Sequence, residues 1–264
     1  MKSIIIGIVN VTPDSFSDGG RFCDIQAAVA HGLKLIKDGA DILDVGGEST
    51  RPGAEPVSID EELSRVIPVI EGLVGKTQER ISIDTRKPEV ARQAVEAGAE
   101  LWNDVSALTY NEDSLTTAAA LDVPVILMHA QGLPETMQTA PSYRDVVEEV
   151  KTYLLARAEA AIAVGVRKEQ IILDPGIGFG KSLQHNIELF QRLGDIVGLG
   201  FPVLLGASRK RFIGDLDGNA EADQRLGGSL AAVLHGARAG VQLFRVHDVA
   251  ETRQALNVWR ALQG

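Results

Sequence analysis

The chain has 264 residues, of which 45% are hydrophobic and 23% are charged. These proportions exclude collagen-like, coiled-coil and disordered chains, and the length allows either two domains or one α/β barrel. The formal net charge of −10 argues against a nucleic-acid partner and against binding to anionic membrane, and the single cysteine, Cys23, excludes an internal disulfide.

We expect no signal peptide at the amino terminus. The apolar run at 4–6 is too short for a signal peptide, and polar residues follow it at Asn10 and Asp14. No run approaches the roughly 20 apolar residues that a membrane-spanning helix needs. We therefore expect a cytoplasmic protein.

Eight short apolar runs, most of them rich in β-branched residues, predict the strands. The runs are continuous rather than alternating, which is typical of strands that are buried on both faces. They lie at 4–9, 41–45, 81–83, 101–105, 124–128, 171–173, 202–205 and 241–246.

Helical patterns separate these runs. Asp24 is predicted to cap a first helix that Gly39 ends. Ser58 and Glu61 form a capping-box pattern, and Pro88 suits the first turn of another helix. Further helices are predicted near 112–120, 143–164, 184–197, 222–239 and 249–262.

The predicted helix exits resemble one another. Glycine stands before a small apolar residue at 39–40, 98–99, 165–166 and 240–241, as expected for a cap that turns the chain into the next strand. Eight βα units in 264 residues give 33 residues per unit, and the total fits a (β/α)8 TIM barrel of about 250 residues. A doubly wound sheet is the alternative, but no G-x-G-x-x-G follows the first run. Since no linker interrupts the pattern, residues 1–264 are predicted to form one domain.

Polar residues follow every predicted strand. The carboxyl ends of barrel strands meet at one mouth, where active sites are built, so we expect one convergent site rather than eight separate helix caps. The polar segments lie at 10–20, 46–53, 84–86, 103–104, 128–129, 174–181, 208–211 and 245–248.

Two groups of side chains at this predicted mouth indicate a chemistry. Carboxylates, an amide and an ammonium suit a flat, nitrogen-rich heterocycle, because carboxylates accept hydrogen bonds from ring N–H and amino groups. Cationic groups suit a phosphate or diphosphate, and an amide oxygen beside phosphate oxygens could hold a hard cation such as Mg²⁺. The group that suits the heterocycle is Asp84, Asn103, Asp174 and Lys210. The cationic group is Arg51, Arg245 and His247, and the amide that could hold the cation is that of Asn10.

Less specific interpretations stay open at this point. Asp84 and Asp174 also suit helix caps, and Arg51 also suits a solvated surface position. Phe16 and Phe179 lie in glycine-rich segments, where core residues are unusual, so a contact with substrate is favoured for both.

Ordered motifs at 7–20, 46–53, 84–85, 103–104, 174–181, 208–210 and 245–249 carry a resemblance to a known family. They include N-V-T-P-D-S-F-S-D-G-G from position 10, G-G-E-S-T-R-P-G from position 46 and D-P-G-I-G-F-G-K from position 174. With these motifs the chain resembles the dihydropteroate synthase family of the folate pathway over nearly its whole length.

The resemblance implies a TIM-barrel transferase. Its expected reaction joins 4-aminobenzoate to 6-hydroxymethyl-7,8-dihydropterin diphosphate and gives 7,8-dihydropteroate and diphosphate. It implies Mg²⁺ as cofactor, sulfonamides as competitors and a homodimer. The implied pterin positions are Asp84, Asn103, Asp174 and Lys210. The implied diphosphate positions are Asn10, Thr50, Arg245, Val246 and His247, and Asn10 is also the implied metal ligand. The implied 4-aminobenzoate positions are Phe16, Thr50, Arg51, Pro52, Phe179, Ser208 and Lys210.

The expected mechanism uses positioning and charge rather than a protein nucleophile. Mg²⁺, Arg245 and His247 would stabilise the charge that develops on the leaving diphosphate. Asp84 and Asp14 would stabilise the cation-like methylene that the aniline nitrogen attacks. These four side chains are the expected catalytic residues.

Two other functions remain as alternatives. A barrel that transfers a methyl group from methyltetrahydrofolate to a corrinoid would share the pterin carboxylates, but it would not need the segments at 49–53 and 208–210. A non-catalytic pterin-binding paralogue would keep the barrel without the reaction. Release of diphosphate from the two substrates separates all three functions.

Overall fold

The computed structural model describes residues 3–12, 21–49, 55–132 and 140–263, and for 21–24 it describes the backbone only. Parallel strands form one eight-stranded sheet in the order β6-β5-β4-β3-β2-β1-β8-β7. The strands are β1 (Ile4–Asn10), β2 (Ile42–Gly46), β3 (Arg80–Asp84), β4 (Leu101–Asp104), β5 (Val125–Met128), β6 (Ile171–Asp174), β7 (Leu204–Leu205) and β8 (Leu243–Val246).

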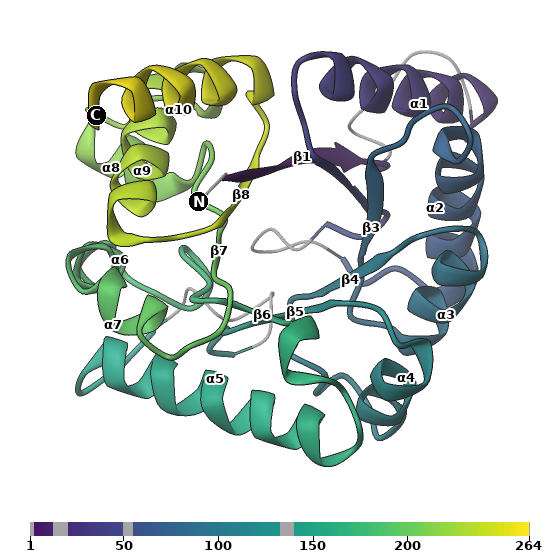
Figure 1. The fold of residues 1–264 in the computed structure, drawn as a ribbon, viewed down its shortest axis with the longest axis horizontal. Coiled ribbons are helices and arrows are strands. Elements are labelled where there is room, and N and C mark those ends of the chain that lie inside the picture. Colours follow the sequence, from purple (N-terminus) through teal and green to yellow (C-terminus); the bar gives the residue numbers. More distant parts are fainter. Residues whose placement is uncertain (1–2, 13–20, 50–54, 133–139, 264) are drawn as a thin grey trace.

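The two end strands of the sheet, β6 and β7, meet and close it into a barrel. Leu173 pairs with Val203 in a parallel bridge, and the Leu173 N–H donates to the Pro202 carbonyl at 2.9 Å. Figure 1 shows the strands around the centre of the molecule and the helices in a ring outside them. The predicted (β/α)8 barrel is confirmed, and the doubly wound alternative is excluded because the sheet has no topological switch point.

The helices follow the predicted pattern with three differences. The first helix begins at Arg21, so Asp24 lies in its first turn and the predicted cap is wrong; an acidic residue is favoured at both positions. The predicted helix at 184–197 is two helices, α6 and α7, separated at Arg192. The sequence does not predict the short α8. The helices are α1 (Arg21–Lys37), α2 (Ile59–Leu73), α3 (Pro88–Glu96), α4 (Asp113–Leu121), α5 (Val146–Ala163), α6 (Leu183–Gln191), α7 (Leu193–Val197), α8 (Arg211–Leu216), α9 (Leu226–Ala239) and α10 (Val249–Gln263).

Local sequence signals place several helix ends. Ser58 caps α2 by accepting a hydrogen bond from the Glu61 N–H at 3.2 Å, and Pro88 opens α3, as predicted. Among the described helices, none is long and apolar enough to cross a membrane.

The four predicted glycine exits share one backbone geometry. Gly39, Gly98, Gly165 and Gly240 have φ between 96° and 112°, where a side chain would be strained. At Gly39, the glycine N–H donates to the Ile36 carbonyl and the next N–H donates to the carbonyl five residues back, and the other three exits repeat this pattern. These paired bonds define a Schellman motif, so the prediction is confirmed.

The barrel interior contains its own apolar cluster, separate from the larger core between strands and helices. This cluster, which we call the barrel plug, fills the barrel toward the amino-terminal ends of the strands and leaves the carboxyl ends to polar side chains. Its members are Ile6, Ile42, Leu101, Ile126, Ile172, Leu204 and Leu243.

Candidate functional site

A layer of polar side chains lies next to the barrel plug, toward the carboxyl ends of the strands. Side chains two residues apart on a strand point to the same face, so each polar residue stands one layer beyond an interior residue of the same strand. The successive interior residues are Ile42 and Asp44, Ser82 and Asp84, Leu101 and Asn103, Ile172 and Asp174, and Leu243 and Arg245. Four residues that the sequence predicts for the site therefore gather in one layer.

Arg245 lies between two carboxylates in this layer. Its Nε donates to Asp44 Oδ2 at 2.6 Å, and its Nη2 donates to Asp84 Oδ2 at 2.7 Å. The same Asp44 oxygen accepts a hydrogen bond from Asn103 Nδ2 at 2.9 Å. Side chains from β2, β3, β4 and β8 are thus joined in one network.

The charge of Asp84 depends on its burial and on the charges of Arg245 and Asp44. Burial raises the pKa of Asp84 to about 7, an effect that the Arg245 guanidinium opposes and that the negative charge of Asp44 reinforces. Arg245 stays protonated throughout the accessible pH range. The Asp84 carboxyl therefore changes its charge near neutral pH.

Lys210 and Asp174 carry opposite charges beside this network. Lys210 Nζ donates to the Ile177 carbonyl and lies 4.3 Å from the centre of the Phe179 ring. Burial lowers the pKa of Lys210 to about 8 and raises the pKa of Asp174, and the attraction between the two groups opposes both shifts. Asp174 Oδ1 also accepts the Gly176 N–H at 2.7 Å.

Ser208 and His247 meet after β7 and β8. The Ser208 hydroxyl accepts the His247 backbone N–H at 3.2 Å, and the hydroxyl oxygen lies 3.0 Å from Nδ1 of the His247 ring. The Ser208 side chain therefore contacts both the backbone and the ring of His247 and fixes the orientation of the imidazole.

The remaining predicted residues divide into two sets. Asn10 is the last residue of β1 and is half-buried beside Gly46, and Val246 is a buried residue of β8 that can offer its backbone. The other predicted residues lie outside the described part of the chain: Asp14, Phe16, Thr50, Arg51 and Pro52.

Sequence reasoning missed Asp44. It stands in the middle of a strand that reads as continuously apolar, and it has no exposed side-chain surface. A carboxylate inside such a run is the signal that could have found it, because buried charges need partners.

A buried ion network and a buried hydrogen-bond network were also missed. Glu62 and Lys87 are buried and bonded to each other behind β3, with Glu48 Oε2 at 3.2 Å from Lys87 Nζ. On the other side, Lys181 Nζ lies 2.9 Å from His129 Nδ1 and donates to the Gly176 carbonyl at 2.9 Å. These side chains brace the loops around the polar layer.

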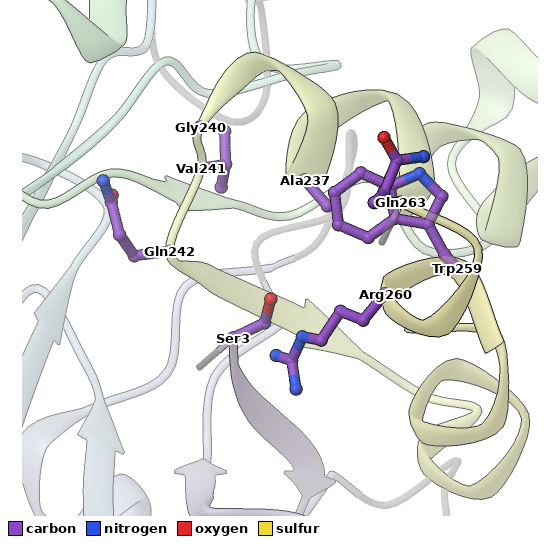
Figure 2. Close-up of a pocket in the computed structure, with 8 residues that line it drawn as sticks. All are labelled: Ser3, Ala237, Gly240, Val241, Gln242, Trp259, Arg260 and Gln263. Carbon is purple, nitrogen blue, oxygen red and sulfur yellow. The ribbon is translucent and has the colours of Figure 1, made fainter. Parts of the chain in front are cut away.

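A pocket of about 320 Å³ lies at the other end of the barrel (Figure 2). Ser3 and Gln242, which precede β1 and β8, line it together with Trp259 and Arg260 of α10. It is separate from the polar layer, which stands at the carboxyl ends of the strands.

Comparison with known proteins gives the chain its relatives. The pterin binding enzyme family matches residues 6–247. The dihydropteroate synthase of Neisseria meningitidis serogroup B is 50% identical over 266 residues, which cover 99% of this chain and 93% of that protein. The enzyme of the same name from Escherichia coli K12 is 48% identical over 257 residues, which cover 97% and 90%.

Solved structures agree over the whole length. A Xanthomonas albilineans dihydropteroate synthase with 4-aminobenzoic acid has a TM-score of 0.94 and 53% identity, covering 100% of this chain and 94% of that one. A Yersinia pestis dihydropteroate synthase with a sulfonamide drug has a TM-score of 0.94 and 42% identity, covering 99% and 94%.

Proposed function

The chain belongs to the pterin-binding enzyme family, and we propose that it is a dihydropteroate synthase that joins 4-aminobenzoate to 6-hydroxymethyl-7,8-dihydropterin diphosphate. The products are 7,8-dihydropteroate and diphosphate. The observation that carries the assignment at the level of chemistry is the layer of two aspartates, an asparagine and a lysine at the carboxyl ends of the strands, in which Asn103 and Asp174 are buried and Asp84 and Lys210 are half-buried.

The pterin ring binds in this layer. Asp174 and Asp84 accept hydrogen bonds from its N–H and amino groups, and Asn103 and Lys210 donate to its oxygen and nitrogen atoms. The network through Arg245 supports this role, because it holds Asp84 and Asn103 in place before any substrate arrives.

The diphosphate binds beside the ring, near Asn10, Thr50, Arg245 and His247, with the backbone at Val246 as a further contact. His247 suits this task because an imidazole N–H can donate to a phosphate oxygen and Ser208 holds the ring in place, with its hydroxyl oxygen 3.0 Å from Nδ1. Arg245 Nη1 makes no hydrogen bond to the described residues and so can donate to the diphosphate, while Nε and Nη2 bond the two carboxylates.

Mg²⁺ fits the donor set at this place. Asn10 offers a hard amide oxygen, and in the described part of the chain no three His, Cys, Asp or Glu side chains gather to form a metal site. Mg²⁺ takes few protein ligands, keeps several waters and binds substrate phosphates, whereas zinc would need a denser set of nitrogen and sulfur ligands. When bound, it would neutralise charge on the leaving diphosphate.

The reaction begins when the bond between the methylene carbon and the diphosphate oxygen breaks, and the electron pair leaves with the diphosphate. His247 and Arg245 donate hydrogen bonds to the departing group. The Asp84 carboxylate, together with Asp14, stabilises the positive charge on the methylene and the ring.

The nitrogen of 4-aminobenzoate then forms the new bond to this carbon and loses a proton to solvent. It needs no strong base, because the amine is neutral near pH 7. Phe179 and Lys210, which the structure brings into contact, form one side of its site, together with Ser208 and the residues Phe16, Thr50, Arg51 and Pro52. Sulfonamides compete for this place.

The whole-protein properties are part of the same proposal. Residues 1–264 form a single domain, two copies form a homodimer, and the enzyme works in the cytoplasm. The methyltransferase and the non-catalytic paralogue are disfavoured, since the chain is about half identical to dihydropteroate synthases over almost its full length.

Diphosphate release on mixing both substrates tests the assignment. We expect one diphosphate per dihydropteroate formed, and no methyl transfer from methyltetrahydrofolate to a corrinoid. Asp84→Asn is expected to lower kcat/KM about 100-fold, in the range for loss of one transition-state contact, while Asp113→Asn at an exposed position changes nothing. A folded wild-type protein that releases no diphosphate would refute the proposal.

A further inference from the structure

Asp44 is a buried carboxylate with no role in the reaction described above. It lies in the middle of β2 and is 0% exposed, one layer beyond Ile42 of the barrel plug. It belongs to the polar layer, and it needs partners there because an isolated buried carboxylate is costly.

One oxygen of Asp44 holds two residues of the proposed site. Oδ2 accepts from Arg245 Nε at 2.6 Å and from Asn103 Nδ2 at 2.9 Å. The Arg245 bond directs the rest of the guanidinium toward Asp84, which accepts from Nη2. Asp44 thus fixes partners on β8 and on β4 from a strand that lies between them in the sheet order.

The charges of the network are unequal. Two carboxylates, Asp44 and Asp84, share the single positive charge of Arg245. The other charges that act on Asp84 come from Glu62 of α2 and Asp104 of β4, which are negative, and from Lys210, which is positive. A change of charge at Asp44 therefore alters how strongly the Arg245 guanidinium stabilises the Asp84 carboxylate.

We propose that Asp44 is a positioning residue, which acts through Arg245 and Asn103 to hold the pterin site in its binding geometry. Through the same contact with Arg245 it limits how strongly the guanidinium stabilises the Asp84 carboxylate. The inference rests on the proposed function, since it concerns the same site. Asp44 itself touches no substrate in this account.

Asp44→Asn is the variant that separates charge from shape. The amide oxygen can still accept from Arg245 and Asn103. The other Asp44 oxygen, Oδ1, is buried without a hydrogen-bond partner among the described residues, as is Oγ of Ser82, the register partner of Asp44 on β3. An amide nitrogen at the Oδ1 position therefore breaks no bond that the structure shows.

The test is the pH profile of kcat/KM for the pterin diphosphate, measured for the wild type, Asp44→Asn and the control Ser82→Ala. Without the competing carboxylate, Arg245 favours the ionised form of Asp84, so the acid limb of Asp44→Asn moves to lower pH by about one unit. Ser82→Ala, which changes a neighbour of Asp44 without touching the network, keeps the limb of the wild type. An unchanged limb in folded Asp44→Asn overturns the inference.

Binding of the pterin without diphosphate, measured by calorimetry, gives the second readout. We expect Asp44→Ala, which removes both hydrogen bonds, to bind at least tenfold more weakly than Ser82→Ala. If the variants do not fold, NMR measures how fast the Arg245 Nε–H exchanges with water in the wild type, and the loss of its signal in Arg245→Lys assigns it. Fast exchange would overturn the inference. Failure of the wild type to release diphosphate would instead refute the proposed function.

Discussion

Asp84 and Lys210 carry opposite charges in the same polar layer, and burial moves their pKa values toward each other, to about 7 and about 8. Asp84 gains its negative charge as the pH rises through the first value, and Lys210 loses its positive charge as the pH rises through the second. The form in which both groups are charged is therefore most populated between these two values. A buried site can thus limit the pH range in which an enzyme is active, even when no side chain acts as a catalytic acid or base.

The first prediction concerns this interval. The profile of kcat/KM for the pterin diphosphate should be bell-shaped, with an acid limb near pH 7 and an alkaline limb near pH 8. Lys210→Arg keeps the charge at high pH, so its alkaline limb should move upward while the acid limb stays. Lys76→Arg, at an exposed position, serves as the control. An alkaline limb that stays in Lys210→Arg would contradict the assignment.

Stability gives a second prediction for Asp84. Its pKa is raised from the ordinary 3.8 in the folded protein, so the folded state holds a proton that the unfolded state has lost. The stabilisation from this proton is complete below about pH 4 and disappears as the pH rises through about 7. Urea unfolding from pH 5 to 7.5 should show the wild type losing roughly 2 kcal/mol or more relative to Asp84→Asn. Parallel stability curves for the two proteins would argue against the raised pKa.

At the level of elements, the loop after β6 is fixed to the end of β5. Lys181 Nζ donates to the carbonyls of Gly176, Phe179 and His129 at 2.9, 3.0 and 3.3 Å, and Nδ1 of the His129 ring lies 2.9 Å away. A Cβ on Gly176 would stand 1.9 Å from the His129 carbonyl, so the two segments pack without space. This loop carries Phe179, and its Ile177 carbonyl accepts from Lys210.

Lys181→Met tests this brace. The variant keeps most of the side-chain volume but removes the lysine donor from three carbonyl oxygens, of which that of Gly176 still accepts the Phe179 N–H at 3.1 Å. Each buried group that stays unpaired costs about 1–3 kcal/mol. We expect the free energy of unfolding to fall by about 3–5 kcal/mol, and KM for 4-aminobenzoate to rise because Phe179 is released. Chemical denaturation and steady-state kinetics measure the two effects. Lys37→Met on the exposed face of α1 is the control, and equal stability of both variants would rule out the brace.

Elements also show which local signals are reliable. The four glycine exits were predictable, because a Schellman motif needs only a glycine and the last turn of its own helix. The break between α6 and α7 was not. It occurs at Arg192, whose Nη1 bonds Asp145, the N-cap of α5, at 2.9 Å, and no pattern within the helix encodes that partner.

At the level of the whole molecule, the barrel closes where its shortest strand lies. β7 has two residues, and the contact between β6 and β7 is a single bridge. Gln242, just before β8, holds Val203 of this bridge from the side opposite β6: its Oε1 accepts the Val203 N–H at 2.8 Å, and its own N–H donates to the Val203 carbonyl at 3.3 Å. A side chain therefore supplies a bond that a longer strand would have made with its backbone.

Gln242→Ala should weaken this closure. Loss of one partly buried hydrogen bond is expected to cost about 1 kcal/mol of unfolding free energy. The amide hydrogen of Val203 should exchange faster, while that of Val45 in the centre of the sheet should not change. Hydrogen-exchange NMR with Gln254→Ala, an exposed position, as control measures this. An unchanged rate at Val203 would show that Gln242 does not support the bridge.

The sequence by itself determined the eight βα units, the helix exits, the family and the polar residue types at the strand ends, because each of these is encoded within a few neighbouring residues. Only the tertiary structure decided the partners of those residues. Arg245 bonds Asp44 and Asp84 across 201 and 161 positions of the chain, and Lys181 meets His129 across 52. Such contacts exist only once the barrel has closed, and their strength comes from burial, which no local pattern reports.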